Sequence, residues 1–403
     1  MGKINIFYIN LKSILRGLFI GRSSNVVLFG AWMGVKFADN SRYLYQYLHA
    51  NKAKYGIKEV IWATRNSEVY DMLTKNGYTA CIIGTKQSEY YHLRAGVHIL
   101  CNAAFPVAGF EPDIDTRFSY GAKKVQLWHG VGIKSIGYSS NDAKRNSTKL
   151  SLLKRISKWP ILNMFRTIGG WDRAKVLATS IKNAEVMRSY LNCQENNIFI
   201  TGYPRNCQCL ELFDEEQKII SHLKKFSQVI LYLPTFRSDT SKYQSPLENR
   251  KLVEYINQNN ILWVEKPHTA DVYYVKPTYE TNNILSLDSN FDINVIYPYV
   301  STIISDYSSV VFDGIIRNIP VVMYVPDLEE FKMGDVGFIF DVEQYCQGLL
   351  AFDLMELKDL VEEALTGNYI NEKRKQVYEN VYHDYFNSAL PSYHQIWESI
   401  IKA

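Results

Sequence analysis

The sequence predicts an α/β protein with two Rossmann-like domains, each built on a parallel sheet and facing the other across a cleft. Three observations lead to this fold class. The length of 403 residues suits two domains of roughly 150–200 residues each. Short apolar runs alternate with helical patterns, which is the order of a parallel sheet with helices on both faces. The alternation restarts after residue 200, which indicates a second sheet.

The first half supplies the first sheet. Residues 25–31 form an apolar run closed by a glycine, and residues 40–56 carry apolar side chains at helical spacing. Asn40 or Ser41 would cap that helix. Further strands of this sheet are expected at 59–64, 79–84, 97–102 and 124–130.

The second half repeats the pattern and ends in helices. Its strands are expected at 228–237, 261–268, 283–287, 301–309 and 320–327, and its last helices at 355–365 and 371–386. The boundary between the domains is expected near residues 199–206. The predicted organisation is therefore an N-terminal segment 1–24, a first domain 25–200, a second domain 201–385 and a C-terminal helix 386–403.

Composition argues against a general nucleic-acid-binding protein and against a disulfide-rich one. Apolar residues make up 47% of the chain, charged residues 21%, and the net charge is only +4, so any basic surface must be local. The six cysteines show no repeated CxxC spacing, and we interpret them as reduced thiols of a cytosolic protein. Cys207 and Cys209 have no second cysteine pair nearby that would complete a metal site.

Two segments are candidates for a membrane surface, although no run approaches the ~20 continuous apolar residues that a spanning helix needs. Segment 1–24 places Lys12 and Arg16 apart from Leu15, Leu18, Phe19 and Ile20. It is either an interfacial amphipathic helix or a helix packed on its own domain. Residues 143–173 hold eight Lys or Arg residues against a single acid, interleaved with large apolar side chains. This segment favours an anionic membrane surface; RNA binding and a solvated charged helix are the alternatives.

Polar side chains stand at or just beyond the carboxyl ends of several expected strands. Because ligands of open parallel sheets bind at that edge, these residues are expected to line a common site. They are His129, Thr235, Arg237, His268, Asp306, Ser308 and Ser309.

The residue types at these positions suit an anionic ligand. Ser308 and Ser309 precede a helix and could seat a phosphate, with Asp313 one turn further on; simple N-capping is the alternative. Lys266 and His268 lie on the same side of an extended strand, as phosphate binding or acid–base chemistry requires.

His129 is the sharpest candidate. It ends an apolar run and is followed by Gly130 and Gly132, which let the backbone approach a ligand closely, and by Lys134. An imidazole here could take a proton from an attacking hydroxyl. The alternative is a core histidine satisfied by the backbone.

With these residues assembled, the chain resembles the CDP-glycerol glycerophosphotransferase family of teichoic acid primases and polymerases. Six motifs follow in the family's order along most of the chain: VLFGAWMGVKFADNSRYLYQYL, WHGVGIKSIG, TGYPRN, ILYLPTFR, KPHT and IISDYSSVVFDGIIRNIPVVMY. The second resembles the family signature WHGTPLKxxG, with VGIK in place of TPLK. This departure lies near the expected acceptor side.

The resemblance implies a GT-B-like fold without catalytic metal or cofactor. It also implies transfer of an alditol phosphate, with glycerol phosphate from CDP-glycerol as the first expectation, to a hydroxyl, with CMP leaving. His129 and His268 would be the catalytic pair. Donor contacts would come from Gly130, Val131, Gly132, Ile133, Arg205, Pro234, Thr235, Lys266, Pro267, Ser308, Ser309 and Asp313. The acceptor side, in domain 25–200, would include Gly34, Asp39 and Lys134.

A lipid-linked glycan acceptor would give segment 143–173 a purpose, which is to hold the enzyme at the cytoplasmic face of the cell membrane in teichoic acid or capsular polymer synthesis. No nucleic acid partner is expected. The alternatives are a glycosyltransferase that uses a nucleotide sugar, a capsule polymerase that uses CDP-ribitol, and a non-catalytic scaffold that keeps the fold.

Overall fold

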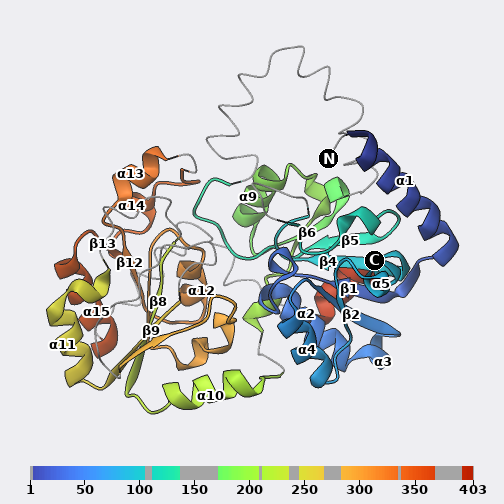
Figure 1. Cartoon of the computed structure of the whole chain (residues 1–403). Helices are drawn as coiled ribbons and strands as arrows, with labels where there is room; N and C mark the ends of the chain where they lie inside the picture. The colour runs from blue at the N-terminus through green and yellow to red at the C-terminus, as the bar shows by residue number, and fades with distance from the viewer. Residues whose placement is uncertain are drawn as a thin grey trace. The chain divides into compact units, whose positions relative to one another are not determined.

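The computed structural model describes residues 3–104, 111–136, 171–207, 211–235, 245–266, 283–334, 337–367 and 393–402. They form two compact units (Figure 1). Unit 1 comprises the described residues of Met1–His129, Arg145–Glu211 and Ser388–Ala403, and unit 2 those of Gly130–Lys144 and Leu212–Asn387. Each unit has its own sheet of parallel strands, so the predicted fold class, α/β with two parallel-sheet domains, is confirmed.

The described strands of unit 1 form one sheet in the order β3-β2-β1-β4-β5-β6-β7. The chain winds outward from β1 and then returns to its other side with β4, which makes the gap between β1 and β4 the reversal point where ligands bind in such sheets. The strands are β1 (Ser23–Phe29), β2 (Glu59–Thr64), β3 (Ala80–Ile82), β4 (Ala95–Leu100), β5 (Lys123–Gln126), β6 (Lys175–Ala178) and β7 (Ile198–Ile200).

The helices of unit 1 lie on both faces of this sheet (Figure 1). They are α1 (Lys3–Ile20), α2 (Asp39–Ala50), α3 (Lys52–Tyr55), α4 (Ser67–Lys75), α5 (Lys86–Arg94), α9 (Ile181–Leu191) and α17 (Tyr393–Ile396), which continues as a π-helix, Trp397–Lys402. The helix expected over 40–56 is divided at Asn51 into α2 and α3.

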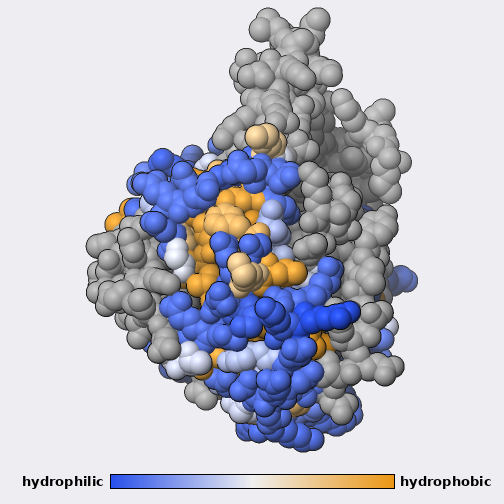
Figure 2. All heavy atoms as spheres, turned by 90° about the vertical axis from the view of Figure 1, so that its left-hand side faces the viewer, coloured by the Kyte–Doolittle hydropathy of each residue, from blue (hydrophilic) through white to orange (hydrophobic). Residues whose placement is uncertain are grey.

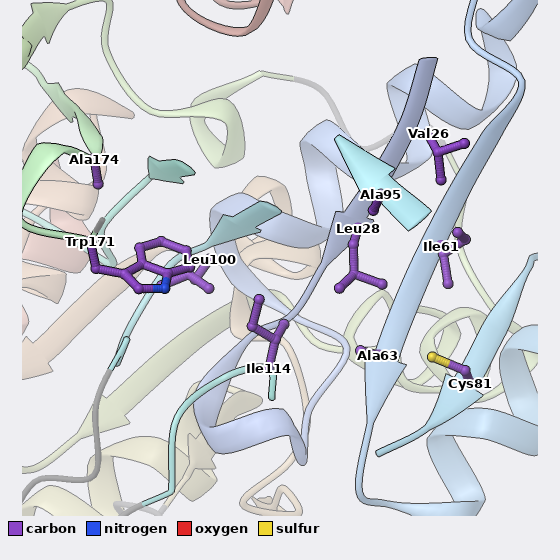
Figure 3. Packing of buried hydrophobic residues seen from close by; sticks show 10 residues of the cluster. All are labelled: Val26, Leu28, Ile61, Ala63, Cys81, Ala95, Leu100, Ile114, Trp171 and Ala174. Carbon is purple, nitrogen blue, oxygen red and sulfur yellow. The ribbon is translucent and has the colours of Figure 1, made fainter. Parts of the chain in front are cut away.

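The two faces of this sheet bury different side chains, because alternate strand residues point to opposite sides. On one face the core is mainly aliphatic, and Figure 3 shows a cluster from it: Val26, Leu28, Ile61, Ala63, Cys81, Ala95, Leu100, Ile114, Trp171 and Ala174. The other face is aromatic. There the ring of Trp62 packs against Phe37 at 4.6 Å between centroids and against Tyr45 at 5.4 Å, so α2 is held to the sheet by edge-to-face contacts.

Unit 2 repeats the winding. Its described strands have the order β10-β9-β8-β11-β12-β13, which places the reversal point between β8 and β11. The strands are β8 (Gln228–Leu233), β9 (Ile261–Glu265), β10 (Ile284–Ser286), β11 (Thr302–Ser305), β12 (Val321–Tyr324) and β13 (Leu350–Ala351). The helices are α10 (Asp214–Leu223), α11 (Arg250–Gln258), α12 (Val310–Ile316), α13 (Leu328–Met333), α14 (Val342–Tyr345) and α15 (Leu354–Thr366).

Unit 2 exposes few large apolar side chains. Its exposed large apolar side chains among the described residues are Met333, Phe352 and Met355. Figure 2 views the side of the molecule on which α11, α13 and α15 lie in Figure 1, and an apolar area framed by hydrophilic residues is visible there.

Helix α1 has features of both structures considered for segment 1–24, a helix packed on its own domain and an interfacial amphipathic helix. It packs on its own unit, where Arg16 pairs with Glu89 of α5. It nevertheless exposes a row of apolar side chains, Leu11, Leu15, Leu18 and Phe19, the last two at 72% and 92%. Within the described residues, no helix has the length and apolar character needed to cross a membrane.

Arg22, directly after α1, fixes the helix end to the sheet. Its guanidinium donates to the carbonyl oxygens of His92, Ala95, Phe118 and Tyr120 at 2.5–2.9 Å. Burial lowers the pKa of this guanidinium to about 10. Such a set of four carbonyl acceptors is what a buried arginine needs to remain charged.

The division of the chain differs from the expected boundary near 199–206. The described residues of 201–211 belong to unit 1, and Glu211 is bound to α2. Its carbonyl oxygen accepts from Arg42 Nη2 at 3.2 Å and Gln46 Nε2 at 3.1 Å, and its carboxylate accepts from Tyr78. Residues 130–136, expected in the first domain, belong to unit 2.

Candidate active site

The loops at the reversal point of unit 1 are strained. Trp32, Met33, Asp39 and Trp128 have φ angles of 44°, 58°, 62° and 60°. The other described non-glycine residues with positive φ are all asparagines. Asparagine and aspartate adopt this conformation at low cost, so the strain at this edge lies in Trp32, Met33 and Trp128. Because such strain costs roughly 1–3 kcal/mol per residue and persists only where the surroundings impose it, this edge of the sheet is a strong candidate for a site.

His129 lies in the loop after β5 and is half-buried. Its Nδ1 is 3.1 Å from the carbonyl oxygen of Cys101, which follows β4. Because a carbonyl only accepts, Nδ1 carries the hydrogen, and in the neutral ring Nε2 carries the lone pair. His129 thus makes, through Nδ1, the backbone contact that a structural histidine would make. The same contact favours the tautomer with a free lone pair on Nε2, which a general base requires.

Arg205 was expected to contact the donor from the second domain, and the structure places it in unit 1 instead. Its Nη1 donates to Asp39 Oδ1 at 3.0 Å and to the carbonyl oxygen of His129 at 2.8 Å, and its backbone N–H donates to Asn40 Oδ1 at 3.1 Å. Asn40 Nδ2 in turn donates to the carbonyl oxygen of Trp128 at 2.8 Å. The arginine therefore acts on the His129 loop.

Asp113, which sequence reasoning missed, organises the same edge. Its carboxylate accepts from the backbone N–H groups of Met33, Cys101, Asn102 and Ala103 at 2.7–3.3 Å. It thereby joins the loop after β1 to the loop after β4. Burial raises the pKa of Asp113 to about 6.

Close packing around Asp113 also explains Gly30. A Cβ at this glycine would lie 2.4 Å from the carbonyl oxygen of Asp113 and from a methyl group of Ile114. Gly34 has φ +72°, and a Cβ there would lie 2.6 Å from the Arg65 guanidinium. Both glycines are therefore required by the loop itself.

Trp32 and Lys36 are further side chains at this edge that the sequence did not single out. The Trp32 ring lies 5.4 Å from the His129 ring between centroids, and its Nε1 donates to Asp39 Oδ2 at 3.2 Å. The Lys36 ammonium lies 5.4 Å from the centre of the indole, and only 4% of this lysine is exposed. The indole ring thus attracts the lysine cation in a cation–π contact, which keeps a positive charge at this edge of the sheet.

At the reversal point of unit 2, Asp306 holds the loop ends. Its carboxylate accepts from Thr235 N at 2.9 and 3.1 Å and from Tyr307 N at 2.7 Å. Ser308 Oγ accepts from Val310 N only at 3.5 Å, and the side chain of Ser309 caps no N–H of α12. N-capping of α12 therefore accounts for little of the hydrogen bonding of these two serines.

The remaining expected donor contacts fall in unit 2 in different settings. Pro234 and Thr235 follow β8, Lys266 follows β9, and the N–H of Lys266 donates to the carbonyl oxygen of Tyr232 at 3.2 Å. The Asp313 carboxylate of α12 lies 3.7 Å from Arg317, the residue that directly follows this helix. Pro267, His268, Arg237 and most of segment 143–173 lie outside the described residues.

The stretch after His129 is part of unit 2. Val131 and Ile133 are buried there, Ile339 N donates to the carbonyl oxygen of Ile133 at 3.0 Å, and Lys134 forms an antiparallel bridge with Phe338. Gly130, with φ 144°, and Gly132 belong to the same stretch. Lys134 is thus in a different unit from Gly34 and Asp39, with which it was grouped on the acceptor side.

Among the described residues, no group of three or more His, Cys, Asp or Glu side chains is placed to hold a metal ion. The described cysteines are free thiols, and burial raises the pKa of Cys81, Cys207 and Cys346 to about 11, 11 and 12. These thiols are therefore protonated near neutral pH.

Comparison with known proteins identifies similar sequences and similar solved structures. The model of the family described as CDP-Glycerol:Poly(glycerophosphate) glycerophosphotransferase matches residues 14–389. A teichoic acid poly(glycerol phosphate) polymerase of Bacillus spizizenii is 26% identical over 367 residues, covering 86% of this chain and 85% of the relative. A polymerase of the same description from Bacillus subtilis is 22% identical, and the chain covers 44% of its length. The structure of the wall teichoic acid polymerase TagF matches with a TM-score of 0.68 at 18% identity, over 100% of this chain and 98% of the other.

Proposed function

We propose that the acceptor of this enzyme is a hydroxyl group of a lipid-linked glycan. The chain belongs to the CDP-glycerol:poly(glycerophosphate) glycerophosphotransferase family. It is therefore a transferase of teichoic acid synthesis that uses a CDP-activated glycerol phosphate. The acceptor oxygen attacks the phosphorus that bears the glycerol. The bond from this phosphorus to the bridging oxygen breaks, and CMP leaves with the electron pair.

One observation carries the assignment of the base. The hydrogen bond from His129 Nδ1 to the Cys101 carbonyl leaves the lone pair of the neutral ring on Nε2. That nitrogen can take the proton of the attacking hydroxyl, and the edge of the sheet on which it lies is the one that binds ligands in this architecture. His268 would be its partner in catalysis by the motif resemblance.

The donor is proposed to bind at the reversal point of unit 2. The loop after β8 with Pro234 and Thr235 meets Asp306, and Ser308 and Ser309 follow β11 directly. Lys266 would add a positive charge for the pyrophosphate, and the backbone of 130–133, which belongs to the same unit, would lie along the donor. Hydrogen-bond donors and positive charges held in place in this way stabilise the negative charge that develops on the leaving phosphate. Asp313 is a weaker candidate because Arg317 is already beside it.

The acceptor is proposed to approach the loops of unit 1. Trp32 lies beside His129, and the Lys36 ammonium lies over the same indole ring; the aromatic ring would suit a sugar and the ammonium a phosphate group. The exposed apolar row of α1 supports attachment at the membrane surface, where a lipid-linked acceptor resides. Segment 143–173, with eight Lys or Arg residues, would add attraction to anionic lipid.

Acceptor-dependent release of CMP tests this function. CDP-glycerol and CDP-ribitol are each supplied with a synthetic lipid-linked disaccharide, and His129→Gln is the control. We expect release from CDP-glycerol, and a fall of roughly 10²–10⁴-fold in the variant. Turnover of CDP-ribitol alone would correct the donor. Turnover of a nucleotide sugar instead, with neither CDP-alditol used, would replace the proposal by glycosyl transfer.

A further inference from the structure

We propose that Asp39, Asn40 and Arg205 form a positioning cluster that fixes the His129 loop through its backbone carbonyls and so sets the orientation and charge of the imidazole. This inference rests on the proposed function, in which His129 is the base. It assigns to Arg205 and Asp39 a role other than donor or acceptor binding.

The contacts converge on two consecutive peptide groups. Asn40 holds the carbonyl oxygen of Trp128 at 2.8 Å, and Arg205 holds that of His129 at 2.8 Å. Trp128 has φ 60°, a conformation that a bulky residue does not keep without support. Two side chains from distant parts of the chain supply that support, and the ring of His129 is directed by the strained peptide.

The cluster is itself closed and buried. Asp39 and Arg205 each have 5% of their side chains exposed and form an ion pair at 3.0 Å. Asp39 Oδ1 also accepts from Asn40 N at 2.7 Å, and Asp39 Oδ2 accepts from the Trp32 indole at 3.2 Å. The carboxylate therefore anchors the arginine on one side and the ring that lies against His129 on the other.

A change in the charge of the Asp39–Arg205 pair should change the protonation equilibrium of the His129 imidazole. Other charged or titratable groups near His129 include Cys101 itself, Asp113 behind it, Lys36 over Trp32, and Tyr190 against Trp128. Asp39 and Arg205 cancel each other's charge. Removal of the carboxylate leaves a positive charge that disfavours imidazolium, and removal of the guanidinium leaves a negative charge that favours it.

Because the two substitutions should shift the protonation of His129 in opposite directions, the inference can be tested without enzymatic activity. The protein is labelled at histidine Cε1, the His129 signal is identified among the eight histidines by its loss in His129→Gln, and its titration is followed by NMR. We expect the midpoint to fall in Asp39→Asn and to rise in Arg205→Gln, each by about half a pH unit. Glu89→Gln, which removes the partner of Arg16 in the same unit, is the matched control and should leave the midpoint unchanged.

Kinetics then separates positioning from binding. In both variants kcat for acceptor-dependent CMP release should fall about tenfold or more while KM for CDP-glycerol changes less than about twofold. Asp39→Asn keeps an oxygen acceptor for Arg205 and tests the inference alone if Arg205→Gln does not fold. Unchanged midpoints, or midpoints that move in the same direction, would overturn the cluster's role. Absence of CMP release in the wild type would instead overturn the proposed function and leave the NMR result readable.

Discussion

The two sheets have the same winding, yet their ligand-binding edges are held differently. In unit 1, Asp113 joins two loops by four backbone N–H groups, and a buried ion pair fixes a third loop. In unit 2, Asp306 holds the ends of two neighbouring strands through Thr235 and Tyr307. The strained residues of unit 1 require the larger framework. The difference indicates that the unit with the proposed base is built for rigidity of its loops.

The largest expected effect is the loss of Asp113. Asp113→Ala leaves four N–H groups without their acceptor and should lower the free energy of unfolding by about 4 kcal/mol, whereas Asp306→Ala should cost about 2 kcal/mol. Urea unfolding, with hydrogen exchange measured on peptides of each unit, would separate the two. Equal losses in both variants would break the comparison.

Glycine substitutions test the same difference between the two units through their packing. Gly30→Ala places a methyl group 2.4 Å from the backbone oxygen of Asp113. In unit 2, Gly314→Ala comes closest to side-chain methyls of Val321 and Ile303, at 2.6 and 2.9 Å, while the nearest backbone atom is 3.7 Å away. Side chains can move more readily than backbone, so we expect a loss of about 3 kcal/mol for Gly30 and about half of that for Gly314. Thermal unfolding of both variants measures this. Gly17→Ala in α1, where the nearest atom is 3.5 Å away, is the control and should not destabilise.

Acid should weaken unit 1 through its buried histidines. Burial lowers the pKa of His92 to about 4 and also lowers that of His98. Between about pH 6.5 and 4 the unfolded chain binds more protons than the folded one, so stability falls as pH falls; for His92 alone the loss is about 2 kcal/mol from pH 7 to 5. Asp113, with its pKa raised to about 6, acts in the opposite sense and recovers part of it.

The measurement is urea unfolding of wild type and His92→Gln at pH 7 and pH 5. The glutamine side chain cannot take up a proton, so the variant should lose less stability over this interval even if it begins less stable. Equal pH dependence in both proteins would show that His92 is not responsible.

The long strands and the edge of the sheet that carries the site could be predicted from the sequence, because apolar runs such as 59–64 are continuous and end in polar residues. The strands β6, β7 and β13 were missed, since four, three and two residues give too short a pattern. The partners of Asp113 and Arg205 could not be predicted either. Their hydrogen bonds reach backbone atoms up to 80 residues away, and no sequence period records such contacts.

The smallest effect on stability is expected at the exposed apolar side chains, where the two units should differ in binding instead. Phe19→Ser in α1 and Met355→Ser in unit 2 remove side chains that are 92% and 70% exposed, so each should change the free energy of unfolding by less than about 0.5 kcal/mol. If α1 attaches the protein to membranes, Phe19→Ser alone lowers sedimentation with vesicles that contain anionic phospholipid, because burial of one such ring contributes about 2 kcal/mol. Equal vesicle binding by Phe19→Ser and wild type would remove α1 from the proposed membrane surface and leave segment 143–173 to be tested by itself.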